Sequence, residues 1–390
     1  MISVAQALDA LFALVSPLDV EDVPLREAHG RVLARSVAAQ RSQPPFAASA
    51  MDGYAVAAAQ AAPGARFTVI GESAAGHRFD GTVAAGQAVR IFTGAPLPAG
   101  TDRVIIQEDV DRSGDVITLK DNLDTNPYVR PAGNDFAAGS TLDAPRLIGP
   151  NDIALMASMN IAAVPVTRKP VVAIIATGDE LVQPGEAPGA DQIIASNSYG
   201  LAALLAQHGA ITRMLPIAKD THESLALAFE LARGADLIVT IGGASVGDHD
   251  LVGAAASAQG MDRAFYKVAM RPGKPLMAGR IGDAAMIGLP GNPVSAMVCG
   301  HIFILPVLRV MLGLPAAPAP RTKAELTQPL TANGPREHYM RARVDAGQVT
   351  VFERQDSALL SVLSQANALA VRAPGDGPRL PGDRIEIIAI

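Results

Sequence analysis

The chain has 390 residues, 49% hydrophobic and 18% charged, with a net charge of −6. This length is too great for one ordinary core, and the composition excludes a largely disordered protein. The acidic balance, the absence of Trp and the 4% aromatic content argue against a nucleic-acid-binding protein, which would need a basic face or stacked aromatic side chains.

The N-terminal region is expected to be helical and to be interrupted by an insertion. Residues 3–16 show helical spacing of apolar side chains behind Ser3, a residue suited to an N-cap, and a second short helix is predicted over Leu25–Ala34. Residues 151–161 are again apolar and helical. We therefore expect an N-terminal domain of two segments, residues 1–45 and 146–168.

The intervening residues 46–145 have a different pattern. Short β-like runs alternate with turns rich in Gly, Pro and Asp, which is typical of a small all-β unit. These runs are Phe67–Ile70, Ala88–Phe92, Arg103–Gln107 and Val116–Leu119. The sequence predicts that this β domain is inserted between the two N-terminal segments.

From residue 169 to residue 315 apolar strands alternate with helices, which predicts a doubly wound α/β domain. The predicted strands are Val171–Ala176, Ile211–Ile217 and Leu237–Ile241, followed by strands near 265–269, 275–279 and 284–288. A proline-rich linker, Pro315–Pro320, then leads to short alternating runs that predict a C-terminal β domain over residues 321–390. The fold class is multidomain α/β plus β.

Four loops follow the strands of the predicted central sheet, and ligands bind at this edge of open α/β sheets. They carry five carboxylates, Asp179, Glu180, Asp220, Asp248 and Asp250. Together these side chains would repel one another unless a hard cation lay among them, and oxygen ligands without Cys favour Mg²⁺. Each carboxylate alone is equally typical of an ordinary turn or helix cap.

Two further segments suit an anion. Arg271 and Lys274 lie in a stretch stiffened by Pro272 and Pro275, where rigidity favours binding of an oxyanion over a mobile surface cation. The turn Gly288–Ser295 leads from a strand into an apolar helix. Its free amides therefore lie at the positive end of that helix and point toward any group that is bound there. The alternative interpretations are a basic surface turn and a rigid corner.

The ordered set of motifs resembles the molybdopterin molybdenumtransferase family, the molybdenum insertases of molybdenum-cofactor synthesis. The motifs that carry the resemblance are Ser49–Ala55, Thr93-Gly94, Thr177–Leu181, Ser196–Ser198, Gly242–Asp248, Pro272–Pro275, Gly288–Ser295, Gln355–Ser357 and Gln365–Leu369. They cover essentially the full length of the chain.

The resemblance implies Mg²⁺-dependent insertion of molybdate into adenylylated molybdopterin, with release of AMP. It implies that the central domain is like the smaller molybdopterin adenylyltransferases. By matching motifs, the catalytic residues would be Asp52, Thr93, Glu180, Asp248 and Lys274. The metal ligands would be Asp179, Glu180, Asp220, Asp248 and Asp250. The substrate-binding residues would be Asp135, Ser196, Asn197, Gly243, Ser245, Arg271, Pro290, Asn292, Pro293, Ser295, Arg336, Arg341 and Ser357.

The resemblance also implies a homodimer in which each cleft lies between the central domain of one subunit and the inserted domain of the other. Transient contacts with the adenylyltransferase and with apo-molybdoenzymes are expected, and contacts with nucleic acid or membrane are not.

The only cysteine, Cys299, excludes an intramolecular disulfide, and the N-terminus lacks the basic region of a secretory signal. The apolar helix His301–Leu314 is predicted to be too short for a membrane span. We therefore expect a cytoplasmic protein.

Two other functions stay open. A molybdopterin adenylyltransferase would use ATP in place of molybdate, although the matched motifs outside the central domain argue against it. A dimeric scaffold or binding protein is the second alternative, because the homologous domain of gephyrin also anchors receptors. Only the short Pro315–Pro320 linker offers any support for that function.

Overall fold

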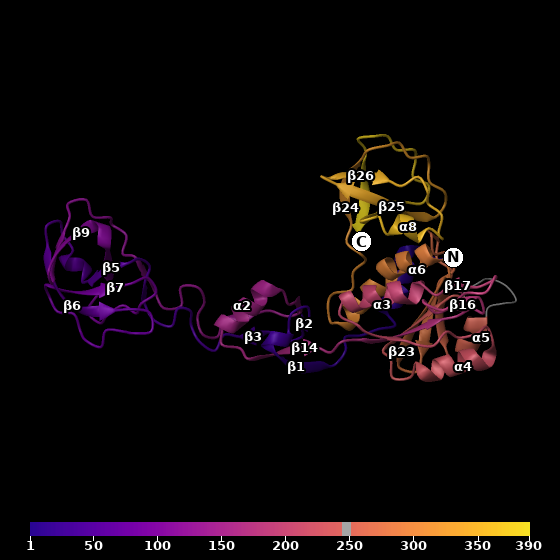
Figure 1. Ribbon diagram of the computed structural model, residues 1–390, viewed down its shortest axis with the longest axis horizontal. Coiled ribbons are helices and arrows are strands. Elements are labelled where there is room, and N and C mark those ends of the chain that lie inside the picture. The colour runs from indigo at the N-terminus through magenta and orange to yellow at the C-terminus, as the bar shows by residue number, and fades with distance from the viewer. Residues whose placement is uncertain (244–250) are drawn as a thin grey trace.

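The computed structural model describes residues 1–243 and 251–390. Figure 1 shows an elongated molecule with a small β unit at one end, a thin sheet with one helix in the middle, and an α/β unit with a β unit stacked on it at the other end. Both chain termini lie at this larger end. The order of units agrees with the predicted fold class.

The middle unit, called the arm below, is formed by two separate segments of the chain. Its four antiparallel strands lie in the order β1 (Val20–Pro24), β14 (Ala163–Thr167), β2 (Val32–Leu33) and β13 (Arg146–Leu147). Helix α2 (Pro150–Ser158) packs beside them, and β3 (Val37–Ala38) pairs with β12 (Thr141–Leu142). The helix predicted over Leu25–Ala34 is wrong. Only the 3₁₀ turn η1 (Leu25–Glu27) forms, because Gly30 at φ 73° turns the chain and Val32 and Leu33 are buried in the sheet.

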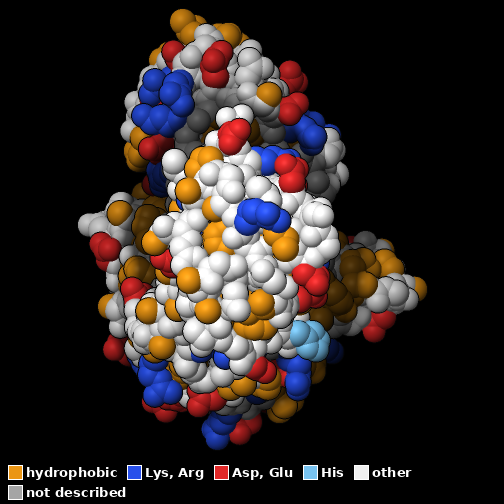
Figure 2. All heavy atoms as spheres, turned by 90° about the vertical axis from the view of Figure 1, so that its left-hand side faces the viewer, with side chains coloured by type: hydrophobic (Ala, Val, Ile, Leu, Met, Phe, Trp, Pro, Cys, Tyr) orange, Lys and Arg blue, Asp and Glu red, His pale blue; other side chains and the backbone are white. Residues whose placement is uncertain are grey.

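The inserted β unit carries a six-stranded sheet, as the alternating pattern predicted. Its strands lie in the order β8 (Arg103–Ile106), β5 (Gly53–Val56), β7 (Gln87–Ile91), β6 (Arg66–Ser73), β10 (Val116–Leu119) and β9 (Val110–Ser113). The short turns η2 (Ala58–Gln60) and η3 (Gln107–Asp109) connect them, and β4 (Ala48–Ser49) pairs with β11 (Val129–Arg130). Figure 2 looks onto this end of the molecule, where hydrophobic, basic and acidic side chains are interspersed.

The central unit is a doubly wound sheet, as predicted. Its strands lie in the order β18 (Ile211–Met214), β15 (Val171–Ala176), β19 (Leu237–Ile241), β23 (Ala284–Leu289), β22 (Met277–Ile281) and β20 (Asp262–Tyr266). The first four strands are mutually parallel, β22 pairs antiparallel with β23, and β20 pairs antiparallel with β22. Helices α4 (His222–Leu231) and α5 (Leu251–Ala258) cover one face, and α3 (Asn197–Gln207) covers the other with the long helix described next.

That long helix runs from Pro293 to Met311 as α6 (Pro293–Cys299), the π-helical turn η4 (Gly300–Ile304) and α7 (Leu305–Met311). It begins in the Gly288–Ser295 turn, as predicted, and by length and composition alone it would suffice to cross a membrane. However, 78% of its apolar window is buried inside the protein, including Cys299. It is therefore the core helix of the central unit.

The C-terminal unit is a closed barrel. Its strands lie in the order β25 (Glu337–Asp345), β26 (Gln348–Val351), β24 (Thr322–Leu326), β28 (Arg384–Ala389) and β27 (Ala368–Arg372), and β27 pairs again with β25. The short strand β21 (Met270–Arg271) joins β25 from the central unit, and helix α8 (Leu360–Leu363) lies next to α6. Tyr339 and Leu369 are buried in the main core of the central unit, so the barrel is firmly attached.

Helix α1 (Val4–Phe12) also belongs to the main core. Its buried side chains, among them Leu8 and Leu11, pack with the central unit, where α1 contacts α7 and β20. Ser3 caps it, as the sequence predicted. The arm therefore begins only after residue 18, where the amide of Leu18 donates to the carbonyl of Met311 over 2.9 Å.

We predict that Leu11→Ala lowers the free energy of unfolding by about 2–5 kcal/mol, because it leaves a cavity in the main core. Urea denaturation followed by circular dichroism measures this loss. Leu227→Ala is the matched control, since Leu227 is 60% exposed on α4 and its truncation should change stability by less than about 0.5 kcal/mol. Equal effects of the two changes would contradict the placement of α1.

Candidate functional site

A cavity of about 530 Å³ opens at the carboxyl ends of the parallel strands in the central unit. The loops after β15, β19 and β23 line it, as does the start of α3. Gly242 makes this convergence possible. Its φ is 95°, and a side chain there would meet the carbonyl oxygen of Thr177 at 2.6 Å. The predicted functional edge of the sheet is therefore a concave cleft.

Three of the predicted carboxylates gather at one end of this cleft. Glu180 and Asp220 line it, and the amide of Asp220 donates to the Asp179 carboxylate over 3.3 Å. Burial, followed by repulsion from Asp179 and Glu180, raises the pKa of Asp220. The shift shows that the carboxylates interact electrostatically, which a set of independent solvated caps would not do.

Only some of the predicted metal ligands lie among the described residues. Ser245, Asp248 and Asp250 lie outside the described residues. Within residues 1–243 and 251–390, no group of three or more His, Cys, Asp or Glu side chains is close enough to hold a metal ion. The three described carboxylates supply hard oxygen donors, the ligand type that Mg²⁺ takes in proteins.

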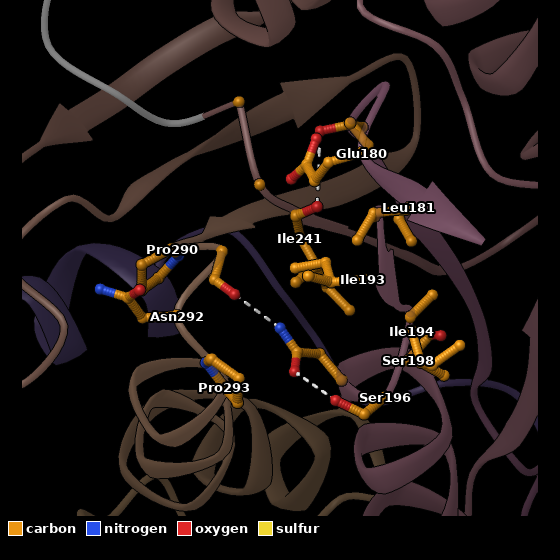
Figure 3. A pocket seen from close by; sticks show the side chains of 18 of the residues that line it. Glu180, Leu181, Ile193, Ile194, Ser196, Ser198, Ile241, Pro290, Asn292 and Pro293 are labelled. Carbon is orange, nitrogen blue, oxygen red and sulfur yellow. Dashed lines mark hydrogen bonds between the residues drawn. The ribbon is translucent and has the colours of Figure 1, made fainter. Parts of the chain in front are cut away.

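The opposite side of the cleft is formed by the turn after β23 and by α3. Pro290, Asn292 and Pro293 line it, and the Asn197 side-chain amide donates to the carbonyl of Gly291 over 2.7 Å (Figure 3). Ser196 in turn donates to the Asn197 side chain over 3.3 Å. These predicted residues therefore converge, with the asparagine holding α3 to the turn. Gly243 lines the cleft as well.

Ser295 differs from the other predicted residues of that turn. It is only 3% exposed, at the buried start of α6, and does not line the cleft. Lys274 is exposed and does not itself line the cleft, but its neighbour Pro275 does, so the backbone of Lys274 lies at the cleft margin. The buried Pro272 and Gly273 precede it, which agrees with the rigid loop that the sequence predicted.

The barrel brings a second group of cations to the central unit. A smaller cavity of about 250 Å³ is lined by Arg271, His338 and Arg372 together with backbone and amide groups. Close to it, Arg341 is completely buried, and its Nε and one terminal nitrogen have no partner among the described residues. Its other terminal nitrogen donates to the Asp356 carbonyl over 2.9 Å, next to Ser357. The Ser357 carbonyl accepts from the amide of Val294 over 3.0 Å, at the start of α6.

The arginines of this region lower the pKa values of their neighbours. Burial, followed by repulsion from Arg271, Arg341, Arg372 and Arg336, lowers the pKa of His338 to about 4. His338 is therefore neutral near neutral pH, and its Nε2 has no partner within the described part of the chain. Burial lowers the pKa of Arg341 as well, and Arg271 adds to that effect. A region with buried, partnerless donors and this much positive charge favours an anion.

The predicted residues of the inserted unit form a separate group. The Asp52 carboxylate accepts from both the amide and the hydroxyl of Thr93, each over 2.8 Å. These two hydrogen bonds, with a smaller contribution from the charge of Arg90, lower the pKa of Asp52. The amide of Ala50 donates to the carbonyl of Tyr128, so the segment that leads to Asp135 runs alongside. Asp135 itself is exposed.

Arg90 is a residue of this group that the sequence reasoning missed. Its guanidinium donates to the carbonyl of Gly53 over 3.1 Å and lies over the rings of Tyr54 and Phe92, at 5.0 and 4.8 Å from their centres. It thereby ties the Asp52 and Thr93 loops together. Nothing in the local sequence marks it, because the contact depends on the antiparallel pairing of β5 and β7.

The two groups of predicted residues are far apart in one chain. Figure 1 places β5 and β7 at one end of the molecule and β23 with α6 at the other, with the arm between them. The single chain therefore brings together the central and C-terminal residues but does not bring Asp52, Thr93 or Asp135 to them.

Comparisons with known proteins agree with this architecture. Three family models match in order: MoeA N-terminal region (domain I and II) over residues 2–160, probable molybdopterin binding domain over 173–310, and MoeA C-terminal region (domain IV) over 323–390. Molybdopterin molybdenumtransferase 2 of Mycobacterium tuberculosis is 35% identical over 94% of this chain and 92% of that protein. The molybdopterin molybdenumtransferase of a Nostoc species is 34% identical over 96% of this chain and 91% of that protein.

Solved structures show the same likeness. The molybdopterin biosynthesis MoeA protein of Pyrococcus horikoshii superposes with a TM-score of 0.87 at 27% identity, covering 100% of both chains. A molybdenum cofactor biosynthesis protein of Pyrococcus furiosus shares the fold with a TM-score of 0.61 at 19% identity.

The raised pKa of Asp220 predicts the direction in which the stability of the protein changes with pH. The folded protein holds the Asp220 proton more tightly than the unfolded chain does, so the folded state loses stability as the pH rises through the raised pKa. Asp220→Asn removes this loss. Without divalent cations, the variant should therefore melt at a higher temperature than the wild type at about pH 7, and the two should converge near about pH 3.

Calorimetric melting curves across this pH range provide the measurement. Asp262→Asn, which removes an exposed carboxylate on β20, is the control and should follow the wild type. If Asp220→Asn melted below the wild type at neutral pH, the carboxylates would not be repelling one another.

Proposed function

The chain belongs to the molybdopterin molybdenumtransferase family, and on this premise we propose that its cleft inserts molybdate into adenylylated molybdopterin and releases AMP. The reaction needs a place for a tetrahedral dianion beside a place for a phosphate anhydride. The cationic region at the barrel and the carboxylate cleft of the central unit lie on the two sides of the segment Arg271–Pro275.

The buried guanidinium of Arg341 is the observation that carries this proposal. Burying a charge is costly unless hydrogen bonds and an opposite charge compensate for it. Here two guanidinium nitrogens lack partners in the described structure, and the charge of Asp356 offsets only part of the cost of burial, to which Arg271 adds. A bound oxyanion would supply both compensations. We assign this role to molybdate, with Arg336 and Ser357 nearby and Lys274 at the cleft margin.

Asp179, Glu180 and Asp220, with Asp248 and Asp250, would hold Mg²⁺ in this proposal. When bound, the ion polarises a phosphoryl oxygen and offsets the charge of the anhydride. The protein's own groups do the rest. Asn197 holds the turn at Gly291 so that Asn292 and the flanking prolines face the substrate. The short, stiff loop at Lys274 holds a cation where the dianion must arrive.

We further propose that a second copy of the chain completes each cleft. Asp52, with its lowered pKa, stays ionised, and Thr93 and Arg90 fix its position. In one chain the arm keeps this carboxylate away from the central cleft, so it would act on the substrate only across a homodimer. The same proposal places the protein in the cytoplasm, where the adenylyltransferase would supply the substrate and apo-molybdoenzymes would receive the product.

An AMP-release assay tests the function. Purified protein with adenylylated molybdopterin should release AMP only when molybdate and Mg²⁺ are both present. Release without molybdate would indicate a hydrolase, and no release under any condition would favour a binding protein. Mg²⁺ alone should also raise the melting temperature of the wild type more than that of Asp220→Asn, because the ion binds to the folded carboxylate group.

We predict that Lys274→Ala raises the molybdate concentration needed for half-maximal AMP release. Its stability should stay within about 1 kcal/mol of the wild type, because an exposed loop cation contributes little to folding. Lys323→Ala, which removes an exposed lysine of β24 in the barrel, is the control and should leave the molybdate dependence unchanged. An unaltered dependence in Lys274→Ala would show that Lys274 does not bind molybdate.

A further inference from the structure

One side of the central cleft carries large apolar side chains that face solvent. Ile193 is 59% exposed and Ile194 is 38% exposed, and both line the cavity together with Leu181 (Figure 3). We call these three residues the apolar wall. The rest of the described lining combines carboxylate, amide and hydroxyl groups with proline and small apolar residues, and the carboxylate of Glu180 directly precedes the wall.

Folding does not explain this wall. None of its three residues belongs to a hydrophobic core in the described structure, although the main core reaches the cleft through Ile241. The exposed apolar area therefore contributes little to stability. Exposed apolar residues that gather in a concave site beside polar groups are typical of surfaces that become buried when a ligand binds.

The backbone holds the wall in a fixed position beside the carboxylates. Leu181 and Val182 form strand β16, which pairs in parallel with β17, formed by Ile193 and Ile194. The amide of Ile193 donates to the carbonyl of Glu180 over 2.7 Å. Any group that packs on Ile193 therefore lies next to the end of the cleft where the phosphate anhydride would be bound.

We propose that the apolar wall binds a planar heteroaromatic ring of the substrate. This inference rests on the proposed function, in which one substrate molecule carries two such rings, adenine and pterin. The faces of these rings are apolar and need partners that phosphate-binding groups cannot provide. No aromatic side chain lines the described cleft, so stacking on an aromatic residue is not available there. The exposed branched aliphatic side chains of the wall offer an apolar face on which the ring can be buried.

The two rings can be distinguished by their fragments. AMP and ribose 5-phosphate differ only by the adenine ring, and 6-hydroxymethylpterin presents the pterin ring without phosphate. Binding of each compound to the full-length protein in the presence of Mg²⁺ can be measured by calorimetry. If adenine packs on the wall, Ile193→Ser should weaken AMP binding about five-fold and leave ribose 5-phosphate unchanged. If pterin packs there, the loss should appear with 6-hydroxymethylpterin instead.

Two further variants make the result specific. Ile193→Leu keeps the apolar surface and should retain most of the binding. Ile211→Ser is the matched control, because Ile211 is 50% exposed at the opposite end of the parallel strands, and it should alter none of the affinities. Melting temperatures should be equal, since neither isoleucine belongs to a described core.

Wild-type affinities in Ile193→Ser for both ring compounds, or a wild type that binds neither of them, would overturn the inference. Such results would leave the proposed function standing as long as the wild type releases AMP in a molybdate-dependent manner. Absence of that release would instead refute the proposed function itself, whatever the binding data show.

Discussion

The arm between the inserted β unit and the central sheet is the constraint on which the rest of the structure depends. It holds the Asp52 loop at one end of the molecule and the central cleft at the other. The arm is tied to the central unit by Arg168, directly after β14, which makes a two-pronged ion pair with Asp236 over 2.8 and 2.6 Å. Asp236 also accepts from the amide of Val171 at the start of β15. A separation of this kind fits a site that is completed by a second copy of the chain.

The charges of the large end are arranged in two opposite groups. Carboxylates gather at the strand ends, where burial and then their repulsion raise the pKa of Asp220. Arginines gather between the central unit and the barrel, where burial and then their repulsion lower the pKa of His338. Each group is electrostatically unfavourable by itself, and the fold tolerates both because the main core continues into the barrel through Tyr339 and Leu369. In our account a cation relieves the first group and an oxyanion relieves the second. Binding of substrate and metal would then stabilise the same region that folding leaves strained.

Much of the fold could be predicted from local pattern. The strands Val171–Ala176 and Leu237–Ile241 have the predicted bounds, because strands buried on both faces are continuous apolar runs flanked by turns. The elements that the sequence did not predict correctly depend on pairing between distant segments of the chain. The segment Leu25–Ala34 looks helical, but its residues Val32 and Leu33 pair with β13 and β14 in a sheet. Strand β27 is recognised only when the barrel closes onto β25.

The site residues likewise divide into those that the sequence predicted and those whose position depends on the tertiary structure. The predicted cleft loops lie together in the structure, as do the predicted residues Asp52 and Thr93, and their roles in catalysis and binding stay predictions. Either Arg336 or Arg341 was expected near Ser357, and Arg341 donates to the carbonyl of its neighbour Asp356. Motif matching did not find Arg90, whose role depends on strand register, or the exposure of Ile193, which looks like an ordinary strand residue in the sequence. It also assigned Ser295 to the cleft, from which its burial at the start of α6 removes it.

A complementation test with mixed dimers addresses the central claim, a cleft shared between two copies of the chain. Asp52→Ala and Glu180→Ala lie in the inserted unit and in the cleft of the central unit, and each should be nearly inactive alone. In a heterodimer with one chain of each variant, one shared cleft would carry both substitutions and the other cleft would carry neither. With random exchange, molybdate-dependent AMP release should recover to about a quarter of the wild-type rate. Verified heterodimers that show no recovery would contradict the claim, because a cleft built within one chain would carry one lesion at every site.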